Sequence, residues 1–427
     1  MKKAALHNLG CKVNAYETEA MQQILENAGY EIVPFTEIAD VYVINTCSVT
    51  NMADRKSRQM FHRAKKMNPD AIVVGAGCYV QTKEAQALVD ESIDIVIGNN
   101  QKHELVTLLN EYEKEHTKQA QIVDINHEKQ EYEELHLKKT AEHTRAFIKV
   151  QDGCNQFCTY CIIPKIRGNY RSVDMDVLIE EAKDLANRGV KELILVAQET
   201  TMYGKDIYGK KSLHILLKKL AKIQGIQWIR ILYCYPEEIY DELIETIADE
   251  KKICHYLDIP IQHASDDVLK RMGRRTSNKQ LREIIGNLRE RIPDIILRTT
   301  LISGFPGETQ EDHEILMKFV NEMEFDRLGV FTYSPEENTP AATMPDQIDE
   351  EVKNFRRNEI MELQQDIVFD TTEKYVGKEF IAMIEGKISG EHAYIARTYM
   401  DCPGVDSNIF VMTDEELMTG DFVKVKV

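Results

Sequence analysis

Three cysteines, Cys154, Cys158 and Cys161, lie close together in the sequence, directly after a predicted strand. The chain has nine cysteines in 427 residues, so chance would give this spacing in fewer than about 1% of such chains. Three close thiolates suit an iron–sulfur cluster, because a cubane has four irons and three cysteines leave one iron open to another ligand. Structural zinc normally takes four protein ligands, and no fourth cysteine or histidine lies nearby, so zinc is the less favoured alternative.

Three further cysteines, Cys11, Cys47 and Cys78, each follow the end of a short apolar run of the kind that buried parallel strands show. Because the carboxyl ends of parallel strands form a ligand crevice, these cysteines are expected to converge at one point. The alternative is that they are three small buried core residues. The other three cysteines have no partner spacing and are interpreted as buried or incidental thiols: Cys234, Cys254 and Cys402.

Composition excludes several classes of protein. The chain has 53 basic and 71 acidic residues and a net charge of −18, which is unfavourable for a general nucleic-acid binder. It contains no apolar run long enough to span a membrane and no apolar signal segment near its start, so we expect a cytoplasmic protein with no membrane contact. In that setting the cysteines are expected to be thiols, metal ligands or catalytic groups rather than a disulfide framework.

Strand and helix patterns alternate along the chain and predict an α/β protein with several domains. Residues 1–110 are expected to form a βαβ-type domain with a parallel sheet. Residues 111–142 are rich in Glu, Lys, His and Gln and predict a charged connector, either a solvated linker or a strap. In residues 143–367, six strands separated by helical stretches predict a partial (β/α)6 barrel with its chemistry at the carboxyl ends of the strands. Short β-like runs in residues 368–427 predict a small β-barrel.

The cysteine triplet on the first loop of a predicted barrel resembles the radical S-adenosylmethionine (SAM) superfamily. That resemblance implies a 4Fe-4S cluster whose open iron binds SAM and supplies an electron that cleaves it. It also implies cofactor contacts from a loop after the second barrel strand and from a Gly-rich turn after the fifth strand. Read without the resemblance, both are ordinary strand-end turns. The residues expected to bind the cofactor are Gln198, Glu199, Thr200, Arg298, Gly304 and Gly307.

The segments around Cys11, Cys47 and Cys78 resemble the amino-terminal domain of the methylthiotransferase family, and with the triplet they identify the chain as a member. The resemblance implies a second 4Fe-4S cluster on these three cysteines and no catalytic residue beyond the clusters. It further implies a monomer that receives electrons from a flavodoxin or ferredoxin. The segments that carry it are Leu9-Gly10-Cys11-Lys12-Val13-Asn14, Asn45-Thr46-Cys47-Ser48-Val49-Thr50 and Gly77-Cys78-Tyr79.

The two parts of the chain resemble different branches of this family. The amino-terminal part, including residues 51–59, is similar to the branch that modifies threonylcarbamoyl-adenosine beside the tRNA anticodon. Arg55, Arg58 and Arg63 lie in a stretch with no acid and predict a helix that contacts phosphate, with a solvated basic face as the alternative. From about residue 165 onward the chain is instead similar to the branch that modifies an aspartate in the twelfth protein of the small ribosomal subunit.

The charge of the last segment discriminates between these substrates. Residues 368–427 contain eleven acids and six bases, whereas a module that grips RNA is expected to be basic. An acidic module suits a basic ribosomal protein, and Asp414, Glu415 and Glu416 are the predicted contacts. We therefore expect methylthiolation of the ribosomal protein, with the tRNA anticodon loop as the alternative substrate.

Other interpretations stay open at this level. A non-catalytic iron–sulfur or zinc scaffold explains the cysteines but not the barrel, and a radical methylase explains the triplet but not Cys11, Cys47 and Cys78. The family usually continues for another strand beyond Val427, so the terminal barrel is expected to be incompletely closed, with an exposed edge. The combination of two branches is consistent with either a natural recombinant or a composite sequence.

Overall fold

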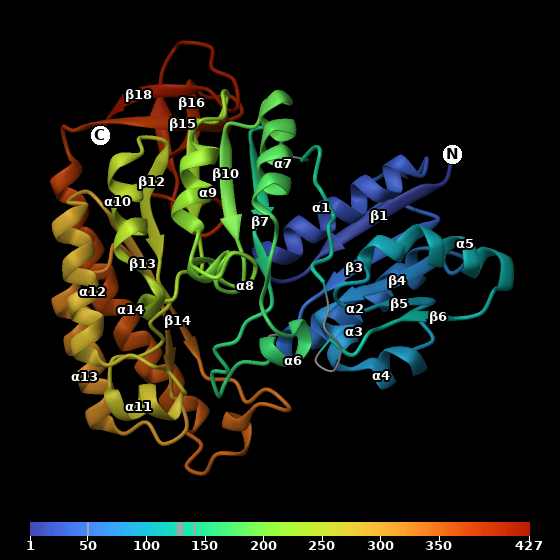
Figure 1. The fold of residues 1–427 in the computed structure, drawn as a ribbon, viewed down its shortest axis with the longest axis horizontal. Coiled ribbons are helices and arrows are strands. Elements are labelled where there is room, and N and C mark those ends of the chain that lie inside the picture. The colour runs from blue at the N-terminus through green and yellow to red at the C-terminus, as the bar shows by residue number, and fades with distance from the viewer. Residues whose placement is uncertain (49–50, 126–130, 141) are drawn as a thin grey trace.

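Three bodies make up the molecule: an amino-terminal sheet domain, a central barrel domain, and a small β module that packs on one end of the barrel (Figure 1). The structure is a computed structural model that describes residues 1–48, 51–125, 131–140 and 142–427. Val49 and Thr50 of the Cys47 segment and Ala141 of the connector lie outside the described residues. No helix within those described ranges is long and apolar enough to cross a membrane.

The amino-terminal domain is a parallel sheet with helices on both faces, as expected for a βαβ-type fold. The buried strand Val41–Thr46 is apolar on both faces because each face packs against a separate hydrophobic core. In the order found in the sheet, the described strands are β2 (Glu31–Ile32), β1 (Lys3–Asn8), β3 (Val41–Thr46), β4 (Ile72–Gly77), β5 (Ile95–Ile97) and β6 (Gln119–Gln121). The helices are α1 (Lys12–Asn27), α2 (Asn51–Met67), α3 (Cys78–Thr82), α4 (Glu84–Val89), η1 (Lys102–Glu104) and α5 (Leu105–Glu115).

This domain extends past residue 110, the boundary expected from composition. Helix α5 continues to Glu115, and Gln119–Gln121 pairs with β5 as an edge strand. The end of α5 and the strand Gln119–Gln121 are mostly polar because a helix end and a sheet edge are accessible to solvent. Residues 131–140 of the connector form a packed strap, since Leu135 and Leu137 are buried in the barrel core and the His136 carbonyl accepts a hydrogen bond from Gln23 of α1.

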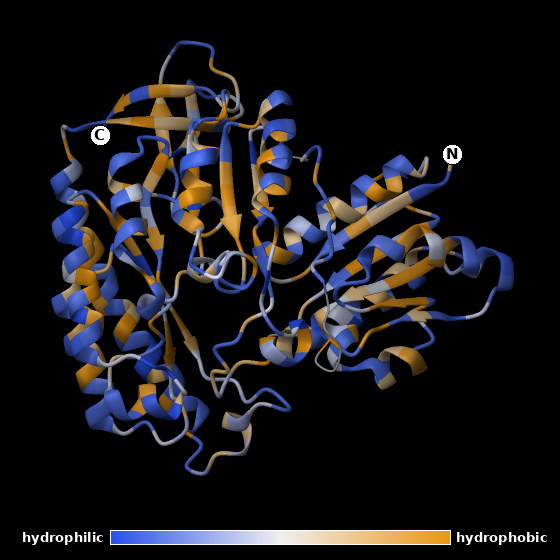
Figure 2. Ribbon diagram, in the orientation of Figure 1, coloured by the Kyte–Doolittle hydropathy of each residue, from blue (hydrophilic) through white to orange (hydrophobic). Residues whose placement is uncertain are grey.

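The central domain confirms the expected partial barrel. Among the described residues, parallel strands pair in the order β7 (Arg145–Lys149), β10 (Glu192–Val196), β11 (Trp228–Ile231), β12 (Ile253–Asp258), β13 (Ile296–Ser303) and β14 (Arg327–Thr332). The longer helices are α7 (Met175–Asn187), α9 (Leu213–Leu220), α10 (Asp241–Asp249), α12 (Asn278–Arg291), α13 (Gln310–Met323) and α14 (Glu350–Thr372). The short elements are β8 (Gln151–Asp152), β9 (Arg171–Ser172), α6 (Ile163–Arg167), α8 (Lys205–Tyr208), α11 (Asp266–Arg271), η2 (Thr200–Met202), η3 (Pro236–Glu238), η4 (Pro340–Thr343) and η5 (Glu373–Tyr375). Figure 2 shows that strand β10 is mostly hydrophobic, whereas helices α12 and α13 carry many hydrophilic residues.

The C-terminal module is an open antiparallel sheet, a half-barrel and not a closed barrel. In the part of the chain that the structure describes, its strands run in the order β17 (Ile409–Met412), β16 (Ala393–Thr398), β15 (Glu379–Lys387) and β18 (Phe422–Lys426). A groove of about 490 Å³ lies between the edge strands β17 and β18. The expected incomplete closure with exposed edges is therefore observed.

The loop between β16 and β17, residues 399–408, enters the barrel and is called the lumen loop below. Side chains alternate across a strand, and one side chain from each of β11–β14 contacts this loop. The Tyr256 hydroxyl donates to Asp406 at 2.7 Å, and Arg327 pairs with Asp401 at 2.7 Å. The loop also reaches the amino-terminal domain, because Lys12 Nζ donates to the Pro403 carbonyl at 3.0 Å. One loop thus contacts both other domains.

Glu181 is a buried carboxyl where α7 packs against α1, and the Tyr16 hydroxyl of α1 donates to it at 3.4 Å. Burial raises the pKa of Glu181 from 4.5 to about 8. Between those two values the folded protein holds a proton that the unfolded chain has released, so stability falls as pH rises, by about 1.4 kcal/mol per pH unit for this group.

We expect Glu181→Gln, which mimics the protonated carboxyl, to raise the melting temperature at pH 8 relative to the unsubstituted protein and to have a smaller effect at pH 5. Melting temperatures of both proteins across this range check the result. The neighbouring exposed Glu180 provides the matched control, since Glu180→Gln should leave the pH dependence unchanged. An equal effect of Glu181→Gln at both pH values would contradict the assignment.

Candidate active site

The fold brings Cys11, Cys47 and Cys78 together, as expected from their positions at strand ends. They follow β1, β3 and β4, which are neighbours in the sheet, so their carboxyl ends lie side by side. Gly10 permits the close approach of two of them: it has a φ of +108°, and a Cβ there would lie 2.8 Å from the sulfur of Cys47. The alternative of three unrelated core residues does not explain why Cys11 is exposed.

The triplet Cys154, Cys158 and Cys161 lies in the loop between β8 and α6. The loop is fixed on two sides: the Thr159 amide donates to the Met272 carbonyl at 2.9 Å, and the Tyr235 hydroxyl contacts the sulfur of Cys158. Burial raises the pKa of the Cys154 thiol and raises that of Cys161 to about 12. These thiols would stay protonated unless a cation such as iron balanced the charge of the thiolates.

Each cysteine set supplies three thiols, the donor chemistry of an iron–sulfur cluster. A mononuclear zinc with bonds of about 2.3 Å draws its sulfurs to within about 4 Å of one another. No group of three Cys, His, Asp or Glu side chains in the described residues is close enough to hold one ion. A cubane is larger and binds each cysteine through a different iron, so it suits thiols that surround a wider space.

The loop that follows β10 carries buried acceptors without partners beside the triplet. Within the described residues, Gln198 Oε1 and Glu199 Oε2 are buried and have no hydrogen-bond partner. Burial, and to a smaller extent the charge of Glu199, raises the pKa of the Cys154 thiol, and burial raises the pKa of Glu199 to about 8. Thr200 is instead satisfied, because its hydroxyl donates to the Leu232 carbonyl at 2.6 Å. The two unpartnered acceptors fit an ammonium group.

The other residues expected to contact a cofactor have protein partners. Gly304 (φ +73°) and Gly307 (φ +75°) leave no room for a Cβ, which would meet Lys353 of α14 and Arg271 of α11 respectively. Packing against Lys353 thus requires glycine at position 304, whereas at position 307 the positive φ favours glycine, because the end of the Arg271 side chain can move. Arg298 faces the lumen, where it pairs with Asp258 at 3.0 Å and with Asp406 of the lumen loop at 3.5 Å.

One short segment, Tyr233-Cys234-Tyr235 after β11, links the two cysteine sets, and reasoning from the sequence assigned it no role. Tyr235 contacts Cys158, and its ring stacks under the Arg274 guanidinium at 3.9 Å. Tyr233 lies close to Cys11, whose charge contributes to a raised pKa of Tyr233 beyond the larger effect of burial. Tyr233 has a φ of +62°, a conformation that costs a non-glycine residue about 1–3 kcal/mol. In the sequence, only the Tyr-Cys-Tyr pattern at a strand end could have indicated that this segment contacts both cysteine sets.

A buried ion cluster joins the amino-terminal domain to the barrel, and we use that name for Glu17, Asp152, Lys102, Lys149 and Arg167. Glu17 of α1 accepts from Lys102 at 3.1 Å, from Lys149 at 3.0 Å and from Arg167 at 2.6 Å. Asp152 of β8 pairs with Lys149 at 3.4 Å and Arg167 at 3.1 Å. The three cations hold the pKa of Glu17 well below its usual range, although burial alone would raise it.

Arg167 connects this ion cluster to the amino-terminal cysteines. Its guanidinium lies 3.7 Å from the Cys78 sulfur and donates to Asn14 Oδ1 at 2.8 Å. The amide of Asn14 donates in turn to the carbonyls of Leu9 and Thr46, each at 2.8 Å, at the ends of β1 and β3. One arginine of the barrel domain therefore fixes the strand ends that carry the first cysteine set.

The residues predicted to bind substrate lie in two separate places. Arg55, Arg58 and Arg63 are exposed on α2, which begins four residues after Cys47. Asp414, Glu415 and Glu416 are exposed in the C-terminal module, after β17. That module packs on the amino-terminal ends of the barrel strands, where Arg397 pairs with Glu192 at 2.5 Å, whereas the cysteines lie at the carboxyl ends. The structure does not bring the acidic residues to the cysteines.

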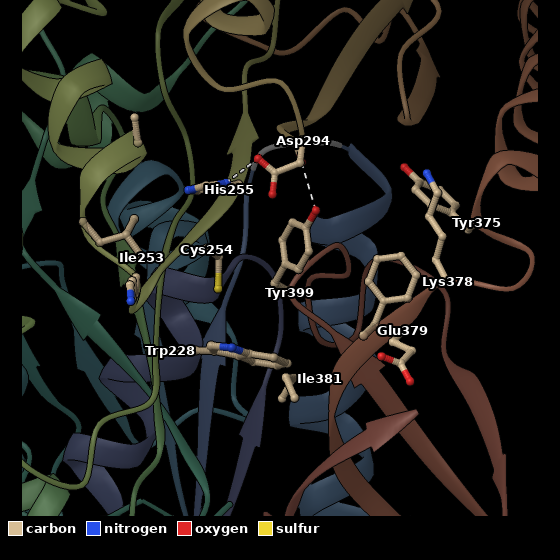
Figure 3. Close-up of a pocket in the computed structure, with 13 residues that line it drawn as sticks. Trp228, Ile253, Cys254, His255, Asp294, Tyr375, Lys378, Glu379, Ile381 and Tyr399 are labelled. Carbon is tan, nitrogen blue, oxygen red and sulfur yellow. Dashed lines mark hydrogen bonds and ion pairs between the residues drawn. The ribbon is translucent and has the colours of Figure 1, made fainter. Parts of the chain in front are cut away.

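A cavity of about 610 Å³ lies at that same far end of the barrel, between β11, β12 and the C-terminal module (Figure 3). Trp228 and Tyr399 contribute aromatic walls. The backbone carbonyl of Asp294 accepts from the Tyr399 hydroxyl at 3.0 Å, and the Asp294 carboxylate pairs with His255 at 2.6 Å. Neither cysteine set lines this cavity, so we place the active site at the cysteines instead.

Comparison with known proteins agrees with this geometry. Family models match the radical SAM superfamily over residues 148–320, the uncharacterized protein family UPF0004 over residues 3–98 and the TRAM domain over residues 376–427. The chain is 49% identical over 426 residues to the ribosomal protein uS12 methylthiotransferase RimO of Lachnoclostridium phytofermentans, covering 98% of this chain and 96% of that protein. It is 44% identical over 430 residues to the protein of the same name from Clostridium botulinum strain Eklund 17B, covering 100% and 95%.

Solved structures support the fold. The radical SAM methyltransferase TsrM of Kitasatospora setae superposes with a TM-score of 0.57 at 15% identity, covering 80% of this chain and 75% of that one. The cobalamin-dependent radical SAM enzyme OxsB superposes with a TM-score of 0.53 at 12% identity, covering 87% and 56%.

The fold and the cysteine sets thus define a radical SAM enzyme, one that uses SAM and an iron–sulfur cluster. The chain belongs to the radical SAM methylthiotransferase family and is of the RimO type. The similarity spans the amino-terminal part of the chain as well.

The buried ion cluster generates a prediction about stability. Glu17→Gln leaves two lysines and an arginine buried with one carboxylate, and breaking a buried pair typically costs about 3–5 kcal/mol. We expect the melting temperature to fall by several degrees. Glu379→Gln is the control: it removes the exposed pair with Lys424, which should cost less than about 1 kcal/mol. An equal fall in melting temperature for the two variants would mean that the buried ion cluster contributes no more to stability than an exposed ion pair does.

Proposed function

We propose that this enzyme adds a methylthio group to the β-carbon of an aspartate in ribosomal protein uS12. The observation that carries the proposal is the full-length similarity, at 42–49% identity, to enzymes named for that substrate. The acidic C-terminal module supports it, because a basic ribosomal protein is attracted to an acidic surface. The target carbon is not acidic enough for a side-chain base to remove its proton, so radical chemistry is needed.

We further propose that the enzyme holds two 4Fe-4S clusters, one on each cysteine set. Cys154, Cys158 and Cys161 would bind the cluster that holds SAM, and Cys11, Cys47 and Cys78 would bind the second. When bound, these groups supply the electron that splits SAM, the radical that removes hydrogen from carbon, and the sulfur that a second SAM methylates. A flavodoxin or ferredoxin is the proposed source of electrons, and the enzyme is proposed to act as a monomer.

Residues of the chain are assigned roles around these groups. Gln198 and Glu199 accept hydrogen bonds from the ammonium group of SAM, because their oxygens are buried and without partners beside the triplet. Thr200 holds their loop to β11. Gly304, Gly307 and Arg298 shape the cofactor side of the barrel from β13. Tyr233 and Tyr235 fix the spacing between the two cysteine sets, so that the substrate carbon is within reach of both.

Modification of the tRNA anticodon loop is the second candidate. The exposed arginines Arg55, Arg58 and Arg63 on α2 favour it, since phosphate attracts such groups. The similarity to enzymes named for uS12 and the acidic C-terminal module weigh against it.

Iron content tests the two-cluster proposal. Anaerobically purified enzyme is expected to contain about eight irons, as two cubanes require. Replacing Cys154, Cys158 and Cys161 with Ala should halve the iron and abolish reductive SAM cleavage. Replacing Cys11, Cys47 and Cys78 with Ala should also halve the iron but leave SAM cleavage measurable. Full iron in the second variant would contradict the second cluster, and an air-stable metal content would indicate zinc.

The substrate is tested by offering uS12 and tRNA to one preparation of reconstituted enzyme with SAM and a reductant. We expect mass spectrometry to find hydrogen replaced by S–CH₃ on one aspartate of uS12, together with 5′-deoxyadenosine. Association with uS12 should weaken with salt, because exposed charges are screened. Asp414→Lys, Glu415→Lys and Glu416→Lys together should slow that association if the acidic module contacts uS12. Product without 5′-deoxyadenosine, or modification of tRNA alone, would overturn the assignment.

A further inference from the structure

Helix α2 carries a concentrated positive charge in a chain whose net charge is −18. Six of its residues are basic and only Asp54 is acidic. The buried face contains Ser57, Phe61 and Ala64, so the bases are turned outward. The exposed side chains of the helix are Met52, Arg55, Lys56, Arg58, Gln59, His62, Arg63 and Lys66. Arg55, Arg58, His62 and Lys66 follow one another at intervals of three or four residues and form one stripe along the helix.

Most of this charge is not neutralised by the protein. Lys65 pairs with Asp94 at 2.7 Å, and His62 lies 3.7 Å from Asp90. In the part of the chain that the structure describes, Arg55, Lys56, Arg58, Arg63 and Lys66 take part in no ion pair. Five exposed cations therefore remain available to an external anion.

The helix starts at the first cysteine set. The Ser57 hydroxyl donates to the Cys47 carbonyl at 3.4 Å, and Ser48 donates to Asp54 at 2.7 Å. From that end, its 17 residues extend for about 25 Å. Arg55 and Arg58 lie in the first two turns, so the basic face borders the active site and leads away from it.

The chemistry of this face favours a phosphate backbone over an acidic protein. Protein interfaces are built around apolar or aromatic anchors, and Met52 is the only large apolar side chain exposed on the described part of α2. Arginines bind phosphate through two parallel N–H donors, and a phosphate polyanion needs only repeated cations. The acidity of the remaining surface repels RNA and so restricts its approach to this face.

We propose that the exposed face of α2 binds the phosphate backbone of RNA that lies beside the modified residue. This inference rests on the proposed function. It states that the substrate is uS12 bound in an RNA-containing small-subunit particle and not only the free protein. A tRNA also has a phosphate backbone, and the experiment below distinguishes RNA of the small subunit from tRNA.

The test compares free uS12, small ribosomal subunits that lack the modification, and tRNA as substrates of the reconstituted enzyme. The test variant combines Arg55→Glu, Arg58→Glu and Arg63→Glu. We expect kcat/KM on subunits to fall at least tenfold at low salt, and modification of free uS12 to change less than twofold. The slope of log kcat/KM against log salt on subunits should become shallower by about 2–3, since each lost phosphate contact contributes about 0.7–0.9.

A matched control changes the charge equally elsewhere. Lys218, Lys219 and Lys222 are exposed on or just after α9, on the outer layer of the barrel. Changing all three to Glu should leave kcat/KM on subunits and on free uS12 within twofold of the unsubstituted enzyme. Iron content and melting temperature of both variants establish that Cys47, next to α2, keeps its environment.

Each outcome decides the proposal. Unchanged activity of the arginine variant on subunits, or equal losses on subunits and free uS12, would overturn RNA binding by α2. An equal fall in kcat/KM on subunits for the lysine control would mean that net charge alone causes the effect. That result would also overturn RNA binding by α2. If the unsubstituted enzyme modifies tRNA and neither form of uS12, the proposed function fails. The α2 face is then upheld if the arginine variant loses activity on tRNA, and overturned if it does not.

Discussion

The arrangement of the molecule depends on a set of charges removed from water at the junction of two domains. Glu17 and Asp152 share Lys149 and Arg167, and Glu17 also pairs with Lys102. Each of these buried charges is stable only while its partners are in place. A displacement of the amino-terminal domain by one or two ångströms would leave several of these groups unpaired. The buried ion cluster thus fixes one relative position of the two cysteine sets, where an apolar interface of similar area would tolerate sliding.

That fixed position matters for the proposed reaction, which uses two cysteine sets carried by different domains. Tyr233 and Tyr235 lie two residues apart, and one side chain lies near Cys11 while the other contacts Cys158. The strained backbone at Tyr233 shows that the segment is held by its surroundings and not by local preference. In the proposed reaction a substrate carbon meets both cysteine sets in turn, and a rigid junction would let it do so without a domain motion.

The sequence predicted the parts of this structure that depend on local pattern. Both parallel sheets, the half-barrel and the convergence of Cys11, Cys47 and Cys78 follow from apolar runs and strand ends. The ion cluster could not be predicted, because Glu17 looks like any acid on an amphipathic helix until a partner 150 positions away is known. For the same reason the composition of residues 111–142 did not reveal that Leu135 and Leu137 are buried, or that the sheet continues to Gln121.

The lumen loop has a consequence for the order in which the protein matures. Lys12 and the Pro403 carbonyl are separated by 391 positions, yet their contact lies beside Cys11. At about 5–20 residues per second, a ribosome takes roughly 20–80 s to synthesise the chain between them. During that interval the amino-terminal sheet can fold, but the barrel lumen lacks the segment that fills it. The surroundings of Cys11 are therefore completed only after translation has reached the last domain.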